Sequence, residues 1–318
     1  MAKYRHGLPL TRGERFLTDG GMETTLIFHE GVDLPHFASF VLMASPEGRR
    51  KLKDYYIRYL ELARSAGVGF VLDTPTWRAS PDWADKLGYD ADALKAVNEE
   101  AIGMLVQLRK LYERPGQPIV LNGAIGPRGD GYKAGTMSAD EAEAYHRPQV
   151  ETFAATEADM VSAVTLTNID EAIGVARAAR KAAIPCVIAF TVETDGRIVT
   201  GRTLQEAIEA VDAATGSYPL FYMVNCAHPS HFEDALDHGS GWIRRVGGIR
   251  ANASALSHQE LDESETLDAG DPEDFGRRYR AFVGRMPQLR LLGGCCGTDH
   301  RHIGAICRAC MSQPAMSA

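Results

Sequence analysis

Short apolar runs alternate along the chain with longer stretches of amphipathic character. The apolar runs end in polar residues or glycine and cover 15–21, 67–74, 118–126, 159–167, 185–192, 220–228, 243–252 and 289–297. Continuous apolar runs of this length are typical of strands buried on both faces, as in a parallel sheet. We therefore expect eight strands with helices between them.

The stretches between the runs show the spacing of amphipathic helices. In 46–67 the apolar side chains fall on one helical face, at Leu52, Tyr55, Tyr56, Tyr59, Leu60 and Ala63. The stretches 168–183 and 203–215 have the same spacing, and they open with Asn168 and Thr203. Both residue types are good helix N-caps.

Eight strand and helix units in one chain favour a (β/α)8 TIM barrel that forms a single domain over 1–318. The alternative is an open doubly wound sheet. Its usual signature, G-x-G-x-x-G after the first strand, is absent. The glycine-rich segment 126–131 has the wrong spacing for that signature, and we interpret it as a loop.

A barrel of this kind places its active site at the carboxyl ends of the strands. Polar residues and cysteines at or just past the predicted strand ends are Asp19, Asp73, Asn122, Thr191, Asn225, Cys226, Asn252, Cys295 and Cys296. Because all the strands converge there, residues far apart in the sequence are able to meet. We expect Asp19, Asn225 and Thr191 to share a pocket with the cysteines and to act in catalysis.

The composition excludes several classes of protein. The net charge of −8 and a pI near 5.7 argue against a nucleic-acid binder, which usually carries a basic patch. The chain shows neither a signal peptide at its start nor an apolar run that could span a membrane. We therefore expect a cytoplasmic protein, in which six cysteines do not form a disulfide framework.

Two adjacent cysteines stand in the segment LLGGCCGTDH, and they could be redox thiols, a vicinal disulfide, packing residues or metal ligands. Neighbours on a strand point to opposite faces, so Cys295 and Cys296 reach one ion only if the strand has ended. The flanking glycines give the backbone that freedom. Together with Cys226 they would offer three soft thiolates and leave a fourth position open, which suits zinc. Cys226 taken alone is equally well explained as a buried packing residue.

The remaining cysteines fit structural roles. Cys307 and Cys310 have C-x-x-C spacing, but a helix is the expected setting and packing the expected role. Cys186 opens the fifth apolar run, at the end of the barrel away from the site, where we also expect packing. His300 and His302 are expected to cap or flank the last helix.

Several motifs together resemble the homocysteine S-methyltransferase family. VNCAHP and LLGGCCGTDHRHI are similar to its zinc-binding segments, and TDGGMETTL and TPTWRAS are similar to its D-G-G-M-G-T and T-N-T-Y-Q-A-S motifs. The similarity covers nearly the whole chain. The family includes betaine–homocysteine and S-methylmethionine–homocysteine methyltransferases and the first domain of cobalamin-dependent methionine synthase.

The resemblance implies a zinc ion held by Cys226, Cys295 and Cys296, with the substrate thiol as its fourth ligand. The zinc-bound thiolate would take a methyl group from a small-molecule donor, and homocysteine would become methionine. No corrinoid or folate module is expected, since the sequence ends soon after the cysteine pair. The sequence is also compatible with a homo-oligomer.

Three positions depart from the family pattern. Val164 stands where the family has a glutamate that binds the amino group of homocysteine. Pro75 replaces an asparagine of the family pattern, and Glu23 replaces a glycine. A valine cannot neutralise an ammonium group, and an unpaired buried charge is costly. Either another carboxylate binds the amino group or the acceptor lacks one. Glu23 and Glu193 are the candidates, although a solvated loop carboxylate is the simpler reading of Glu193.

The substrate-binding residues are accordingly expected to be Asp19, Gly20, Gly21, Glu23 and Val164. Two alternatives to homocysteine methylation stay open. One is a methyltransferase that acts on a different small thiol. The other is a zinc-bearing barrel that binds a ligand without catalysis.

Overall fold

Eight strands form the centre of the computed structural model, which describes residues 1–236 and 240–311. Their bounds are β1 Phe16–Leu17, β2 Gly69–Asp73, β3 Ile119–Ile125, β4 Met160–Leu166, β5 Cys186–Phe190, β6 Tyr222–Asn225, β7 Val246–Ala251 and β8 Leu291–Gly294. Every strand lies within one of the predicted apolar runs, so the strand prediction is confirmed.

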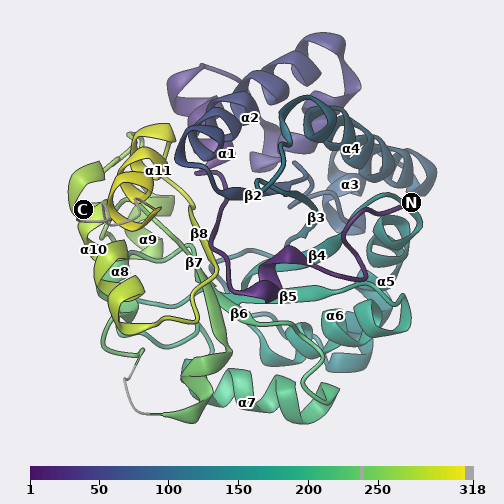
Figure 1. Ribbon diagram of the computed structural model, residues 1–318. Coiled ribbons are helices and arrows are strands. Elements are labelled where there is room, and N and C mark those ends of the chain that lie inside the picture. Colours follow the sequence, from purple (N-terminus) through teal and green to yellow (C-terminus); the bar gives the residue numbers. More distant parts are fainter. Residues whose placement is uncertain (237–239, 312–318) are drawn as a thin grey trace.

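The strands are parallel and close into a barrel in chain order (Figure 1). Closure is seen at β1, where Phe16 pairs with Gly69 of β2 on one side and with Leu291 of β8 on the other. The predicted (β/α)8 barrel is confirmed, and the alternative of an open sheet is wrong. The segment 126–131 after β3 is a loop, as predicted.

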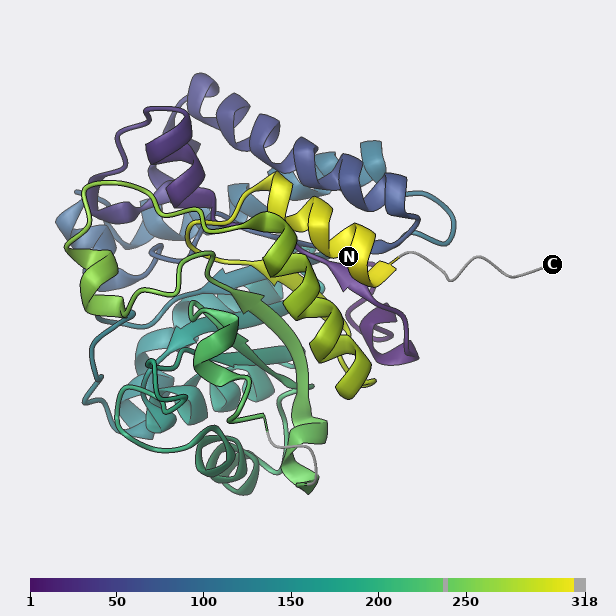
Figure 2. The ribbon, with the colours of Figure 1, turned by 90° about the vertical axis from the view of Figure 1, so that its left-hand side faces the viewer.

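Helices surround the barrel. The α-helices are α1 Met22–Thr24, α2 Pro46–Ala66, α3 Pro81–Lys86, α4 Ala91–Tyr112, α5 Ala139–Ala155, α6 Ile169–Lys181, α7 Leu204–Thr215, α8 Pro229–Phe232, α9 His258–Asp262, α10 Pro272–Arg285 and α11 His300–Ile306. Short 3-10 helices lie at Pro9–Arg12, Pro35–Phe37, Ser39–Ala44 and Gly241–Arg245, and π-helical turns at Thr25–His29 and Cys307–Met311. Figure 2 shows α10 and α11 packed side by side on the outside of the barrel.

The predicted helices have the predicted caps. The Asn168 side chain accepts a hydrogen bond from the backbone of Asp170 at the start of α6. Thr203 and Glu206 form a capping box at the start of α7, which satisfies two backbone groups that the helix leaves free. Gly67 ends α2 in the left-handed conformation, at a φ of 70°.

Apolar side chains fill the barrel interior. They come from the strands and from the N-terminal segment, and they include Leu8, Leu10, Phe16, Val71, Val120, Met160, Val187, Ala189, Met223 and Leu291. The N-terminal segment is fixed at the amino end of β4, where the Tyr4 backbone donates to Asp159 at 2.7 Å. It therefore covers the amino end of the barrel, and the opposite end remains for a site.

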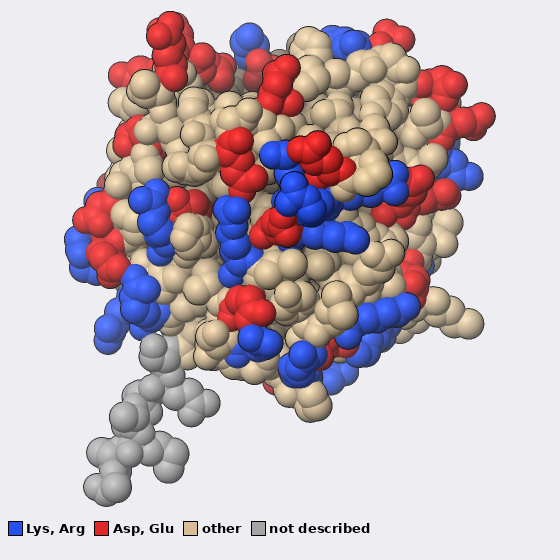
Figure 3. Space-filling model, turned by 90° about the horizontal axis from the view of Figure 1, so that it is seen from above, with Lys and Arg blue, Asp and Glu red and all other residues tan. Residues whose placement is uncertain are grey.

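Charged side chains of both signs lie on the molecular surface. On the face in Figure 3, cationic and anionic side chains are interspersed. Across the described residues, no helix combines the length and apolar character that a membrane span requires.

Candidate active site

A pocket opens at the carboxyl end of the barrel, with a volume of about 410 Å³. Strand ends and the loops that follow them form its walls. The residues predicted for the site that line it are Asp19, Gly20, Gly21, Glu23, Val164, Asn225, Cys226, Cys295 and Cys296. Thr191 is the member of that set that the lining does not include.

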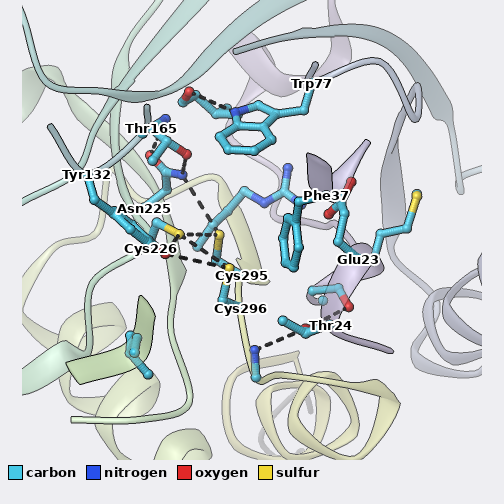
Figure 4. A pocket seen from close by; sticks show the side chains of 18 of the residues that line it. Glu23, Thr24, Phe37, Trp77, Tyr132, Thr165, Asn225, Cys226, Cys295 and Cys296 are labelled. Atoms are coloured by element: carbon cyan, nitrogen blue, oxygen red, sulfur yellow. Dashed lines mark hydrogen bonds between the residues drawn. The ribbon is translucent and has the colours of Figure 1, made fainter. Parts of the chain in front are cut away.

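The sulfur atoms of the three predicted metal ligands lie together in this pocket (Figure 4). Cys226 Sγ is 3.1 Å from Cys295 Sγ and 3.6 Å from Cys296 Sγ, and all three atoms lie within 4.8 Å of one another. In the described part of the chain, no other three Cys, His, Asp or Glu side chains form a group of this kind. The cluster is therefore the candidate metal centre.

Backbone turns at two strand ends bring the thiols together. β6 ends at Asn225, and Cys226 then adopts the left-handed conformation with a φ of 56°, which is uncommon for a residue with a Cβ. β8 ends at Gly294, so Cys295 and Cys296 lie in the turn that follows, and Gly297 has a φ of 78°. Both cysteines of the pair therefore face one site. This is the condition under which adjacent cysteines can bind one ion.

The thiols share hydrogen bonds and one favoured site for negative charge. Contacts from the Cys226 and Cys296 thiols, aided by the Arg250 charge, hold the pKa of Cys295 well below its usual range despite its burial. The contact with Cys295 raises the pKa of Cys226, and the contact with Cys226 raises that of Cys296. The cluster therefore favours one thiolate, on Cys295, and a thiolate is the form of cysteine that binds a metal.

Tyr132 contacts this cluster and was not predicted from the sequence. Its hydroxyl lies 3.1 Å from Cys226 Sγ and 3.8 Å from Cys296 Sγ. Its ring stacks on His258, with the centroids 4.0 Å apart and the planes at 14°. His258 also lies 2.8 Å from the Cys226 carbonyl oxygen. The sequence marks Tyr132 only as an aromatic residue at the end of the glycine-rich segment after β3.

Asn225 and Thr191 support the cysteines in different ways. Asn225 lines the pocket, and its side-chain nitrogen is 3.9 Å from Cys295 Sγ and donates to Thr165 Oγ1 at 2.8 Å. Thr191 is fully buried and donates to the Cys226 carbonyl oxygen at 3.2 Å. Its expected place in the pocket is corrected: β5 ends at Phe190, and Thr191 lies behind Cys226 instead of facing the cavity.

Asp19 belongs to a buried ion-pair network at the floor of the pocket. Its carboxylate lies 2.6 Å from Arg250, which also pairs with Asp73, and it accepts a hydrogen bond from Tyr55 at 3.2 Å. Burial raises the pKa of Asp19 to about 7, although the Arg250 charge opposes this effect. Arg250 was not predicted either, and its signal is a lone cation within an otherwise apolar strand.

Gly20 and Gly21 are needed where the β1 loop approaches the cysteine turn. A Cβ on Gly20 would lie 2.8 Å from the Thr298 carbonyl oxygen, and one on Gly21 would lie 2.6 Å from the Cys295 carbonyl oxygen. Side chains at either position would displace the backbone of the cysteine turn. These glycines are therefore explained by close packing, in addition to any contact with substrate.

The two candidate carboxylates differ in position. Glu23 lines the pocket, accepts a hydrogen bond from Ser39 at 2.6 Å and has its pKa raised by burial. Glu193 lies outside the lining and is 3.1 Å from His258 Nδ1. Val164 lines the pocket at the end of β4, and its carbonyl accepts from the Trp77 indole at 3.3 Å. Of the two carboxylates, Glu23 is thus the one that a ligand bound in this pocket can contact.

The other cysteines and histidines have the structural settings that were predicted. Cys186 is fully buried at the start of β5, and burial raises its thiol pKa to about 12. Cys307 and Cys310 lie in the helical turn after α11 and pack against the core. His302 completes the cap of α11 with Asp299.

A family profile and individual relatives match the chain. The profile described as homocysteine S-methyltransferase matches residues 16–310. The homocysteine S-methyltransferase of Escherichia coli strain K12 is 26% identical, with 93% of this chain and 96% of the relative covered. A selenocysteine Se-methyltransferase of Brassica oleracea var. italica is 22% identical, with 93% and 89% covered.

The fold also matches a solved structure. The metallated form of the homocysteine methyltransferase MmuM from Escherichia coli superposes with a TM-score of 0.71 at 23% identity. The match covers 94% of this chain and 97% of that one, and it supports the barrel fold. The family profile spans nearly the whole chain and matches both segments that carry the cysteines. This chain therefore belongs to the homocysteine S-methyltransferase family and is an S-methyltransferase.

Proposed function

We propose that the protein transfers a methyl group from a small-molecule donor to the thiol of homocysteine, with zinc bound by Cys226, Cys295 and Cys296. The observation that carries this proposal is the convergence of three cysteine sulfurs in a pocket at the carboxyl end of the barrel. The names of the relatives and the metallated form of the Escherichia coli structure support it.

The cysteine cluster fits a zinc ion in chemistry and in size. Zinc bonds to thiolate at about 2.3 Å, so two ligands of a tetrahedral site lie about 3.8 Å apart. The sulfur pairs at 3.1 Å and 3.6 Å come close to that spacing, and small rotations of the side chains would complete it. When bound, zinc would hold the acceptor as its thiolate at neutral pH.

The residues around the cysteines would keep their sulfur atoms in place. Tyr132 and Asn225 point donors at the sulfurs and partly neutralise their charge. Thr191 and His258 fix the Cys226 carbonyl from behind, which holds this residue in its left-handed conformation. Asp19 would orient polar groups of the substrate from the pocket floor. It would do so through the part of its carboxylate that does not contact Arg250.

The pocket wall favours a cationic methyl donor. Phe37, Trp77 and Tyr132 supply aromatic faces, and the carboxylates of Asp130 and Asp262 add negative charge. A sulfonium or quaternary ammonium group is attracted by both. Such a donor also leaves as a neutral molecule after it loses its methyl group. The two substrates would be held in line within one enclosed site, and orientation of this kind provides much of the rate.

Another small thiol is the second candidate for the acceptor, because Val164 lines the pocket where the family resemblance implies a glutamate for the amino group. A relative that acts on selenocysteine also supports a wider range of acceptors in related proteins.

The free thiols fit a reducing compartment such as the cytoplasm. We keep a homo-oligomer as a further prediction.

A matrix of donors and acceptors tests this function. Zinc-loaded protein is incubated with S-methylmethionine or glycine betaine and with homocysteine, cysteine or 4-sulfanylbutanoate, and the methylated products are detected by mass spectrometry. We expect S-methylated product with homocysteine, and none when Cys296→Ala replaces the wild type. If no methylated thiol forms in any combination, the proposal is wrong.

A further inference from the structure

Two oppositely charged side chains of the pocket wall have no ionic partner in the described part of the chain. Glu23 lies in α1 and Arg78 in the loop after β2, and both line the pocket. Among the described side chains, Glu23 accepts from the Ser39 hydroxyl and Arg78 donates to the His36 carbonyl, but neither joins an ion pair. Their charges still influence each other. The two groups therefore line one cavity without forming an ion pair with each other.

Glu23 presents an under-neutralised carboxylate to the pocket. Its carboxylate accepts the 2.6 Å hydrogen bond from Ser39 and one from its own backbone, and among the described residues no cationic side chain pairs with it. Burial raises the pKa of this carboxyl group. A partly buried carboxylate in this state is costly unless a cation pairs with it. An ammonium group of a ligand would supply that cation.

Arg78 presents the complementary group. Its guanidinium lies 4.0 Å from the Trp83 ring centroid and 4.9 Å from that of Trp77, and these contacts fix its plane. Its Nε is buried and has no hydrogen-bond partner among the residues that the structure describes. A planar guanidinium with free N–H groups matches a carboxylate, which can accept two parallel hydrogen bonds.

We propose that Glu23 and Arg78 bind the zwitterionic head group of an α-amino acid substrate, with Glu23 on the ammonium and Arg78 on the carboxylate. The inference rests on the proposed function in placing the sulfur of that substrate at the cysteines. It assigns specificity to two residues on the β1 and β2 side of the pocket. The β4 side, at Val164, is then free to be apolar. In Figure 4, Glu23 lies across the cysteines from Tyr132 and Asn225.

A series of three acceptors separates the two roles. Homocysteine carries both groups, 4-sulfanylbutanoate lacks the ammonium, and 3-aminopropane-1-thiol lacks the carboxylate. We expect Glu23→Gln to lower kcat/KM by about tenfold to a hundredfold for homocysteine and the aminothiol, and to leave the butanoate unaffected. Arg78→Gln should lower kcat/KM for homocysteine and the butanoate, and leave the aminothiol unaffected.

Exposed residues of α5 provide matched controls. Glu151→Gln and Arg147→Gln make the same chemical changes outside the pocket, and we expect all three acceptors to react as with wild type. Equal losses on all three acceptors in the Glu23 and Arg78 variants, or no loss on any, would overturn the inference.

A binding measurement keeps this inference separate from the proposed function. L-Methionine has the same head group and no thiol, so its binding to metal-free protein by calorimetry does not depend on methyl transfer. We expect wild type to bind it and both variants to bind it about tenfold or more weakly. Wild type that binds methionine but methylates no thiol would refute the function alone. Variants that bind methionine as wild type does would refute the inference alone.

Discussion

The hydroxyl of Tyr132, in the loop after β3, lies within reach of two of the three cysteine sulfurs. Donors of this kind stabilise the charge of metal-bound thiolates and fix their direction. Its stacking on His258 extends the support, because His258 in turn holds the carbonyl of Cys226. The site therefore depends on residues that are not ligands themselves.

The contribution of Tyr132 can be measured directly. Because loss of such a supporting group typically weakens metal binding by about 10- to 100-fold, we expect Tyr132→Phe to lower zinc affinity by that factor. Competition with a chromogenic chelator gives the affinity. Tyr145→Phe is the matched control, since that hydroxyl bonds to Ser80 outside the pocket. Equal zinc affinities for Tyr132→Phe and wild type would show that the Tyr132 hydroxyl does not support metal binding.

At the scale of elements, the site is assembled where the β1 loop packs on the turn after β8. Gly21 N–H donates to the Thr298 carbonyl at 3.0 Å, and Gly297 N–H donates to Thr24 Oγ1 at 3.1 Å. These contacts join the first and last units of the barrel beside the cysteines. The same contacts therefore stabilise both barrel closure and the cysteine cluster.

A methyl group at Gly21 would separate these two segments, since its Cβ would lie 2.6 Å from the Cys295 carbonyl oxygen. We expect Gly21→Ala to lower the free energy of unfolding by about 1–3 kcal/mol and to weaken zinc binding. Gly103→Ala is the contrasting variant. Gly103 lies inside α4, where an added Cβ would meet no atom within 4 Å, so alanine should stabilise by about 1 kcal/mol. Denaturant titrations of both variants test this, and a neutral Gly21→Ala would contradict it.

The cap of α11 carries a second prediction at this scale. Asp299 is buried, yet its hydrogen bonds with His302 and Arg301 hold its pKa well below the usual value. A depressed carboxyl pKa stabilises the fold above the unfolded pKa of about 3.9 and loses that effect as the pH falls below it.

We expect Asp299→Asn to destabilise metal-free protein by about 1–3 kcal/mol at pH 7, and by less at pH 3. Asp271→Asn, at the N-cap of α10, is the control. Asparagine is as good a cap as aspartate, so its cost should stay within a few tenths of a kcal/mol. Urea unfolding at both pH values measures the difference. A cost for Asp299→Asn that is unchanged from pH 7 to pH 3 would show that its charge is not the cause.

For the whole molecule, the sequence was sufficient to predict the barrel. All the strands fall in apolar runs because a strand buried on both faces has to be apolar throughout, and this signal is local. The cysteines were predictable too, since the turn after β8 is marked by its glycines. The signals for these features are carried by residues that are neighbours in the chain, whereas the features themselves join distant segments, such as Cys226 with Cys295 and Cys296.

Features that depend on contacts between distant segments were not predictable. Tyr132 lies in the loop after β3 and contacts Cys226 after β6, and Arg78 is fixed by the indole of Trp83 and by the His36 carbonyl. Thr191 was misplaced because the end of an apolar run does not tell which side chain faces the pocket. Such details follow from packing of the loops after the barrel has closed.

The metal content of cysteine variants tests the central claim most directly. Zinc per chain is measured by inductively coupled plasma mass spectrometry after gentle purification of wild type, Cys226→Ala, Cys295→Ala and Cys296→Ala. Cys186→Ala is the control, since Cys186 is buried away from the pocket. We predict about one zinc for wild type and the control, and loss of most of the metal from each of the other variants. Full zinc in both Cys295→Ala and Cys296→Ala would contradict the account.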